Sequence, residues 1–134
     1  PSLPDVGRAA QGTKRTGTVG PGFTISLKDG AVAVHDVWVA IDPGSIVNPA
    51  IIEAQVNSAV ALGLSSALFE EVVYAKGTPQ ARNFDAYPIL PPDRMPRVHV
   101  RILQSGDPMG GIGEPGLPGV PPAVANAVAV LTRQ

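Results

Sequence analysis

The residue best placed to do chemistry is Glu114, a single carboxylate inside a run of glycines and prolines. The run reads Gly-Gly-Ile-Gly-Glu-Pro-Gly over residues 110–116, and prolines follow at positions 118, 121 and 122. Glycine lets the backbone approach a ligand closely, and proline fixes the path of the chain. A carboxylate held in this way can act as a general base. The alternative interpretation is a Pro/Gly loop with a solvated glutamate.

Gly111, Gly113 and Gly116 also match the G-x-G-x-x-G pattern of dinucleotide-binding proteins. That pattern requires a helix to open directly from the turn, with an acidic residue roughly 20 residues further on. Here prolines delay the helix, and no such acid follows before Gln134. We therefore reject a dinucleotide site of this type at the loop.

Composition narrows the class of protein. The 134 residues are 44% apolar, enough for the core of one domain, and 15 glycines with 15 prolines argue against an all-helical bundle. The net charge of -1 indicates no field for nucleic acid or an anionic membrane. The chain has no cysteine, so it has no thiolate ligands for a metal or an iron–sulfur cluster, and its compartment stays open between cytoplasm and periplasm. Polar residues interrupt every apolar run, so we expect no membrane-spanning helix.

A β-hairpin is predicted in the first third of the chain. Two β-rich segments, 23–27 and 31–41, flank the turn residues Asp29-Gly30. The second segment is apolar almost throughout, so we expect a central strand buried on both faces. Residues 1–20 are polar and glycine-rich, and they are predicted to be an N-terminal arm or loop.

Helical signals follow. Asn48 and Pro49 suit an N-cap and a first helical position, and apolar residues recur at helical spacing over 50–69. Gly63 inside this helix indicates close backbone packing. We predict further strands over 70–75 and 98–103, the latter half-exposed, and a terminal helix over 123–131.

These elements predict an α/β (α+β) fold. It comprises a mixed sheet of about four strands, one long helix packed on the sheet and a C-terminal helix after the Gly/Pro-rich loop.

Six motifs, taken in order, resemble the C-terminal part of the molybdenum-binding large subunit of the xanthine oxidase family. They are Asp42-Pro43-Gly44-x-Ile46-Val47-Asn48-Pro49, Gln55, Gly63-Leu64-Ser65, Asn83-Phe84-Asp85-x-Tyr87-Pro88, Gly110-Gly111-Ile112-Gly113-Glu114-Pro115 and Pro122-Ala123-x-Ala125-Asn126-Ala127. The similarity is greatest to the isoquinoline 1-oxidoreductase and aldehyde dehydrogenase branch. It implies that residues 21–134 are the C-terminal portion of a molybdopterin-binding domain.

The resemblance also implies a reaction and a site. A molybdenum–pterin cofactor, in the cytosine dinucleotide form, would hydroxylate an aldehyde or an N-heterocycle with oxygen from water. Glu114 matches the catalytic base of the family, and Gln55 matches a glutamine near the pterin, although a solvent-facing or interhelical amide explains Gln55 equally well. The backbone at Gly111 and Gly113 would approach the cofactor or substrate. No residue is assigned as a metal ligand.

Partners follow from the same resemblance. Family large subunits are several times longer, so we expect the remaining large-subunit segments, a small 2Fe-2S subunit that carries the iron–sulfur clusters, and a small-molecule substrate. We also expect a homo-oligomer or a heteromeric complex, and an enzyme that is inactive as this chain alone. The alternatives are a non-catalytic structural or assembly subunit with the same fold and a free binding module for a small aromatic ligand.

Other polar and aromatic residues are expected to be structural. Asp42 is predicted to tie the turn before Pro43, and Asx turns explain Asn83 and Asp85 as well as a place near the active-site funnel does. Tyr87 lies in the same irregular segment. The two histidines are predicted to be ordinary strand residues, and the single tryptophan a core or interface residue; these are His35, His99 and Trp38.

Overall fold

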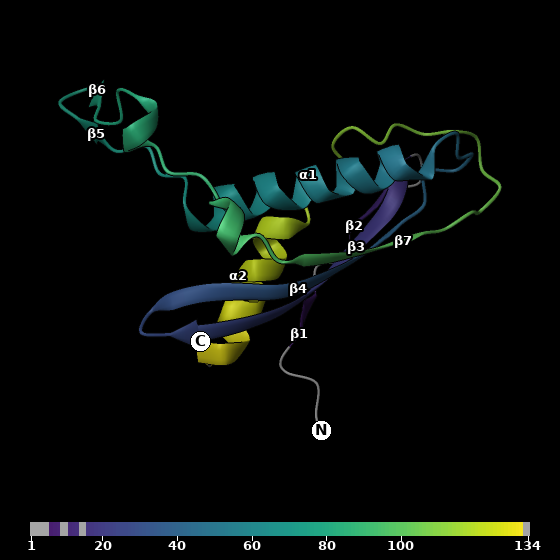
Figure 1. Ribbon diagram of the computed structural model, residues 1–134, viewed down its shortest axis with the longest axis horizontal. Helices are drawn as coiled ribbons and strands as arrows, with labels where there is room; N and C mark the ends of the chain where they lie inside the picture. Colours follow the sequence, from purple (N-terminus) through teal and green to yellow (C-terminus); the bar gives the residue numbers. More distant parts are fainter. Residues whose placement is uncertain (1–5, 9–10, 14–15, 133–134) are drawn as a thin grey trace.

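The computed structural model describes residues 6–8, 11–13 and 16–132, and its centre is a mixed sheet. Four strands run in the order β1 (Val6–Arg8), β3 (Thr16–Lys28), β4 (Ala31–Ile41) and β7 (Arg97–Ile102), and β2 (Gln11–Thr13) also pairs with β3. The hairpin partners β3 and β4 are antiparallel, whereas β4 and β7 are parallel. Figure 1 shows the sheet and its helices. The predicted α/β fold with a mixed sheet is confirmed.

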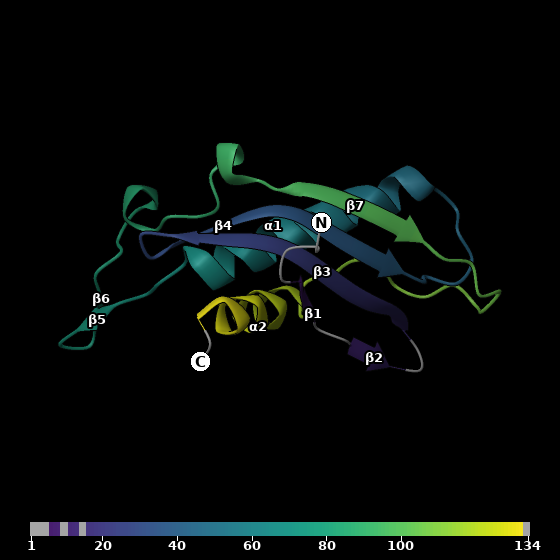
Figure 2. The same ribbon diagram turned by 90° about the horizontal axis from the view of Figure 1, so that it is seen from below.

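Two helices close the core. Helix α1 (Pro49–Leu68) lies between β4 and β7 in the chain, and α2 (Val120–Thr132) packs on β1, β3 and α1. Figure 2 shows α2 beneath β3, with β1 beside one end of the helix. One buried cluster joins both helices to the strands; it comprises Phe23, Ile25, Val37, Val39, Ile41, Ile52, Val56, Val60, Leu64, Val120, Ala123, Val124 and Ala127. The helices therefore cover the same face of the sheet.

Helix α1 begins where the sequence predicts. The side chain of Asn48 accepts hydrogen bonds from the backbone amides of Ala50 (3.0 Å) and Ile51 (3.4 Å), and Pro49 occupies the first helical position. Parallel strands need a long crossover, and α1 provides it between β4 and β7. The start of the helix is thereby fixed beside the end of β4.

By length and composition α1 could cross a membrane, since it has 20 residues and a mean hydropathy of 1.3. However, its inner face supplies Val56, Val60 and Leu64 to the core, each at most 1% exposed. The core helix of a globular domain satisfies the same test, so length and hydropathy alone do not make α1 a membrane span.

A β-bulge in the hairpin reverses which residues of β4 face the helices. Thr24 pairs with Asp36 and Ile25 pairs with Val34, which leaves His35 as the extra residue. After the bulge, the alternation places Val37, Val39 and Ile41 in the core, while Trp38 points to the opposite face and is 42% exposed. The prediction that this strand is buried on both faces is therefore wrong, because the helices cover one face only.

Trp38 is likewise not a core residue. Its ring stacks on the ring of His99 on the outer face of the sheet, with a centroid distance of 5.2 Å.

Other boundaries differ from the predictions. Within the stretch predicted as an arm or loop, residues 6–8, 11–13 and 16–20 are in strands. The strand predicted over 70–75 shrinks to β5 (Tyr74–Ala75), which pairs with β6 (Thr78–Pro79) outside the main sheet. The terminal helix starts at Val120, so Pro121 and Pro122 lie in its first turn, where their missing amide protons cost little.

Candidate functional site

The candidate site lies where the parallel strands β4 and β7 end. Ile41 and Ile102 are paired in register, and the amide of Leu103 still donates to the carbonyl oxygen of Ile41 at 2.8 Å. Beyond this point β4 continues into Asp42-Pro43-Gly44, and β7 continues into the long loop 103–119. Ligands of open α/β sheets bind outside the carboxyl ends of the strands. Both candidate motifs therefore meet at the edge of the sheet that is typical of binding sites.

The Asp42 carboxylate ties the two segments together. One of its oxygens accepts a hydrogen bond from the Gly44 amide at 3.0 Å and another from the Ser105 hydroxyl at 3.1 Å. These hydrogen bonds, led by that of Gly44, lower the pKa of Asp42 below its usual value. The predicted role of Asp42 in its turn is confirmed. The bond to Ser105 had no signal in the sequence, because 63 positions separate the two residues.

The same turn packs closely against the loop. The Gly110 amide donates to the carbonyl oxygen of Pro43 at 2.9 Å. Gly44 has a φ of +74°, and a side chain there would collide with the backbone carbonyls of Asp107 and Pro108. The start of the glycine-rich run is thus fixed by the end of β4.

Further along, the run lies across one stripe of α1. The stripe consists of Gln55, Ala59 and Gly63, which are four residues apart and share a helix face. The Gln55 side-chain amide donates to the carbonyl oxygen of Gly113 at 3.4 Å. A Cβ atom on Gly116 would lie 2.9 Å from the Cβ of Ala59.

The stripe ends at the start of α2. A Cβ atom on Gly63 would lie 2.5 Å from the Cβ of Val120, which confirms the close packing predicted for this glycine. Figure 1 shows the loop leaving β7, passing over α1 and entering α2.

Glu114 sits between two of these contacts and is exposed to solvent. Its carbonyl oxygen accepts from the Leu117 amide at 3.0 Å, which closes a turn behind it. Next to it Ile112 packs against the core, while a Cβ atom on Gly111 or Gly113 would meet open space. An exposed carboxylate on a fixed turn can accept a proton from a bound molecule. The open sides of the two glycines leave room for such a molecule.

These residues fit one side of a molybdenum–pterin site. The backbone at Gly111 and Gly113 faces open space that side chains at these positions would occupy, and the Gln55 side-chain amide bonds Gly113 beside that space. The structure thus brings together Gln55, Gly111, Gly113 and Glu114, and their roles stay predictions. Across the described ranges, no group of three or more His, Asp or Glu side chains is placed to hold a metal ion.

The irregular segment lies elsewhere, at the C-terminal end of α1. The Asn83 side chain accepts from the Phe84 amide at 2.9 Å and caps a short 3-10 turn, and the Tyr87 hydroxyl donates to the Glu70 carboxylate at 3.2 Å. Asp85 lies in that turn and is exposed. Asn83 and Tyr87 therefore have structural roles, as predicted. Asn83, Asp85 and Tyr87 all lie away from Glu114.

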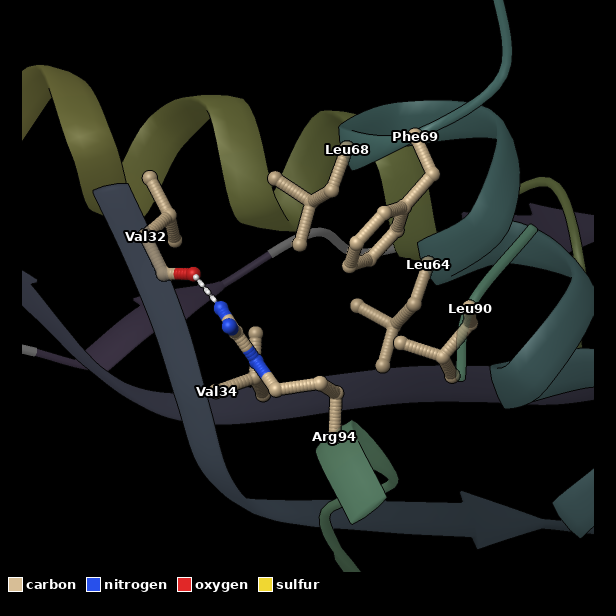
Figure 3. A pocket seen from close by; sticks show the side chains of 7 residues that line it. All are labelled: Val32, Val34, Leu64, Leu68, Phe69, Leu90 and Arg94. Carbon is tan, nitrogen blue, oxygen red and sulfur yellow. Dashed lines mark hydrogen bonds between the residues drawn. The ribbon is translucent and has the colours of Figure 1, made fainter. Parts of the chain in front are cut away.

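A small apolar cleft opens at this same end of α1. Figure 3 shows the Arg94 guanidinium beside it, donating to the carbonyl oxygen of Val32 at 3.2 Å. Its apolar lining comes from β4, α1 and the segment after α1: Val32, Val34, Leu64, Leu68, Phe69 and Leu90. It is remote from the Gln55 end of the helix, so it does not belong to the Glu114 site.

A polar network covers the outer face of the sheet. Arg97 forms an ion pair with Asp36 at 2.9 Å, and His99 contacts the same carboxylate at 2.9 Å. These hydrogen bonds, led by that of Arg97, lower the pKa of Asp36. His35 bonds the Ser26 hydroxyl at 2.8 Å, so both histidines are strand residues, as predicted. The alternation of apolar and polar residues over 97–102 predicts that one face of this strand is exposed. It does not predict the parallel register of β4 with β7, which brings Asp36 to Arg97.

Comparison with known proteins assigns the family. Residues 11–96 match the molybdopterin cofactor-binding domain. The chain is 40% identical over 106 residues to isoquinoline 1-oxidoreductase subunit beta of Brevundimonas diminuta, an alignment that covers 79% of this chain and 14% of that protein. It is 34% identical to the membrane-bound aldehyde dehydrogenase (pyrroloquinoline-quinone) of Gluconacetobacter polyoxogenes, covering 78% of this chain and 14% of that protein.

A solved structure has the same fold. The crystal structure of quinoline 2-oxidoreductase from Pseudomonas putida 86 superposes with a TM-score of 0.78 at 26% identity, covering 87% of this chain and 16% of that one. This chain therefore spans about a seventh of the length of these relatives. It belongs to the molybdopterin cofactor-binding domain family, as part of a molybdenum-binding subunit of the xanthine oxidase type.

Proposed function

We propose that this chain forms one side of the active site of a molybdenum hydroxylase, an enzyme that oxidises an aldehyde or an N-heterocycle with water as the oxygen source. The observation that carries the proposal is the contact between Gln55 on α1 and the carbonyl of Gly113, directly before Glu114. This contact lies near the carboxyl ends of the parallel strands β4 and β7, where α/β proteins bind ligands. The family and its relatives support a molybdenum-cofactor oxidoreductase.

Each residue has a defined task in this proposal. Glu114 is the general base: it accepts a proton beside the cofactor, which supplies the redox chemistry when bound. The Gln55 amide would donate to the pterin, and the backbone at Gly111 and Gly113 would lie against cofactor or substrate oxygens. Asp42, Ser105 and Gly44 position the loop rather than touch the substrate.

Further components complete the proposed enzyme. Relatives are subunits of larger enzymes, and this chain spans about a seventh of their length. We therefore propose that the remaining large-subunit segments complete the pocket, that the cofactor is the cytosine dinucleotide form, and that a small 2Fe-2S subunit takes the electrons. The protein would form a homo-oligomer or a heteromeric complex, located in the cytoplasm or the periplasm. This chain alone should be inactive.

The test is Glu114→Gln in the complete molybdenum-binding subunit assembled with its partners. Glutamine is nearly isosteric but cannot accept the proton, so the rate of cofactor reduction should fall about 10²–10⁴-fold, roughly 3–5 kcal/mol of barrier. Reduction is followed in a single turnover with an aldehyde and with an N-heterocycle such as isoquinoline, and molybdenum content is measured in parallel.

Glu53→Gln is the matched control, because Glu53 is an exposed acid on α1 outside the stripe. It should leave the rate unchanged. If Glu114→Gln keeps its molybdenum and a near-normal rate, the carboxylate is a loop charge. The chain is then a structural or assembly component with the same fold.

A further inference from the structure

An apolar arm projects from the body of the protein between α1 and β7. We call residues 70–90 the arm; they include the small β5–β6 hairpin and the 3-10 turn Phe84–Ala86. Figure 1 shows the hairpin and the turn beyond the C-terminal end of α1, and β5 and β6 pair with each other rather than with the main sheet. Connections of this length in compact domains usually have a function.

Its apolar side chains lie in solvent. The Phe84 side chain is 94% exposed, and four more large apolar residues are 48–65% exposed: Val72, Val73, Tyr74 and Ile89. Exposed apolar residues that gather on one short segment of a folded protein are a common mark of an interaction site. Aromatic residues presented in this way are typical anchors of protein interfaces.

The arm is nevertheless held in a defined conformation. At its base the Leu90 amide donates to the Ser65 hydroxyl at 2.9 Å, and the Tyr87 hydroxyl donates to Glu70 at 3.2 Å. At its tip the Gln80 amide donates to the carbonyl oxygen of Val73 at 2.8 Å. The turn under Phe84 is capped by Asn83. Binding therefore requires little further ordering, which favours affinity.

The charges of the arm exclude some partners. Two basic residues, Lys76 and Arg82, stand against three acids, Glu70, Glu71 and Asp85. This mixture offers no basic cluster for an anionic membrane or a nucleic acid. An exposed phenyl ring such as that of Phe84 is best buried in an apolar cleft on another protein surface.

We propose that the arm docks, through Phe84, into an apolar cleft formed by the rest of the molybdenum-binding subunit. This inference rests on the proposed function, in which those segments complete the enzyme. Two observations favour this occupant: the arm lies within residues 11–96 that match the family, so it is part of the domain, and about six-sevenths of the relatives' length lies outside this chain.

The test measures how far the arm is protected in the complete molybdenum-binding subunit. The chain has no cysteine, so Ala86→Cys places a thiol beside Phe84. Labelling of this thiol by a maleimide, followed at the peptide that contains residue 86, should be at least tenfold slower in the complete subunit than in this chain alone. In the complete subunit, Phe84→Ser should raise the labelling rate at least tenfold, whereas Val130→Ser, a change of an exposed apolar residue on α2, should alter it less than twofold.

Other outcomes overturn the proposal. Equal labelling rates in the complete subunit and in the chain alone would refute docking of the arm and leave the proposed function standing, as would equal effects of Phe84→Ser and Val130→Ser. Protection that appears in the chain alone as its concentration rises would make a second copy the occupant. Protection of the chain by phosphatidylcholine vesicles would make a lipid surface the occupant. The Glu114→Gln experiment tests the proposed function independently.

Discussion

Replacing Gly44 by alanine should destabilise the protein by forcing the turn after β4 away from the loop that carries Glu114. Gly44 has a φ of +74°, a conformation that costs an L-residue about 1–2 kcal/mol. In addition, the new Cβ atom would lie 2.8 Å from the carbonyl oxygen of Asp107 and closer still to that of Pro108. Both neighbours are backbone, so relief requires movement of the loop itself.

The control is Gly30→Ala, which separates the two costs. Gly30 has a φ of +79° but meets nothing within 4 Å. It should therefore show the conformational cost alone, about 1–2 kcal/mol. Gly44→Ala should add an overpacking cost of about 1–3 kcal/mol, so that the two variants differ by roughly 2 kcal/mol.

Urea unfolding of both variants measures this difference. With a slope of about 2 kcal/mol per M, Gly44→Ala should unfold roughly 1 M below Gly30→Ala at an unchanged slope. In the complete subunit, Gly44→Ala should also slow substrate oxidation, because Gly110 bonds to Pro43 in the same turn. Equal midpoints for the two variants would show that the turn and loop are not packed as described, and the account of how the loop is held would fail.

Three further changes probe the scaffold. Gly63→Ala should lower the free energy of unfolding by about 1–2 kcal/mol, because the new Cβ atom meets Val120, although alanine has the better helix propensity. In urea titrations, recovery of this stability when Val120→Ala is added would confirm the contact, whereas a Gly63→Ala variant more stable than the unmodified chain would contradict it. Asn48→Ala should cost about 1 kcal/mol in the same assay through loss of the N-cap of α1, and a negligible change would contradict the capping role. The lowered pKa of Asp36 means that its stabilising effect is present above the ordinary value near 3.8 and is lost as the pH falls through the lowered value. Asp36→Asn should therefore lower the urea midpoint at pH 7. In strong acid the midpoints of the variant and the unmodified chain should come closer together, and a difference between them that does not depend on pH would refute the ion pair.

Local signals explain what the sequence predicts well. The Asp29-Gly30 turn and the Asn48-Pro49 cap act within a few residues, so the hairpin and the start of α1 follow from them. The glycine at position 63 is informative for the same reason, since an isolated glycine in a helix indicates a close neighbour.

The sequence predicts poorly those features that depend on pairing between strands far apart in the chain. β1 and β2 are short and glycine-rich, and they are strands because β3 pairs with them. The apolar residues Val72 and Val73 suggest a strand, yet no strand of the main sheet lies beside them. The bulge at His35 shifts the buried face of β4 by one residue, and the alternation alone does not reveal it.

In the candidate site too, local contacts are predictable from the sequence and long-range contacts are not. The Asp42 turn follows from Asx chemistry, but its bond to Ser105 depends on the pairing of β4 with β7. The family resemblance places Gln55 and the glycine loop near the same cofactor, but nothing in the spacing of residues 55 and 113 predicts the hydrogen bond between them.

The stripe on α1 explains how a loop rich in glycine can still hold the backbone at Glu114 in one place. Gly113 is bonded to Gln55, and Gly116 is in contact with Ala59, so fixed points lie on either side of Glu114. The third contact, between Gly63 and Val120, fixes the start of α2 to the same helix face. Glycine is needed at 63 and 116 for close approach, not for flexibility, because a Cβ atom at either position would separate the segments. Displacement of the backbone at Glu114 therefore requires movement of α1 or loss of these contacts, and this rigidity suits the general-base role proposed for Glu114.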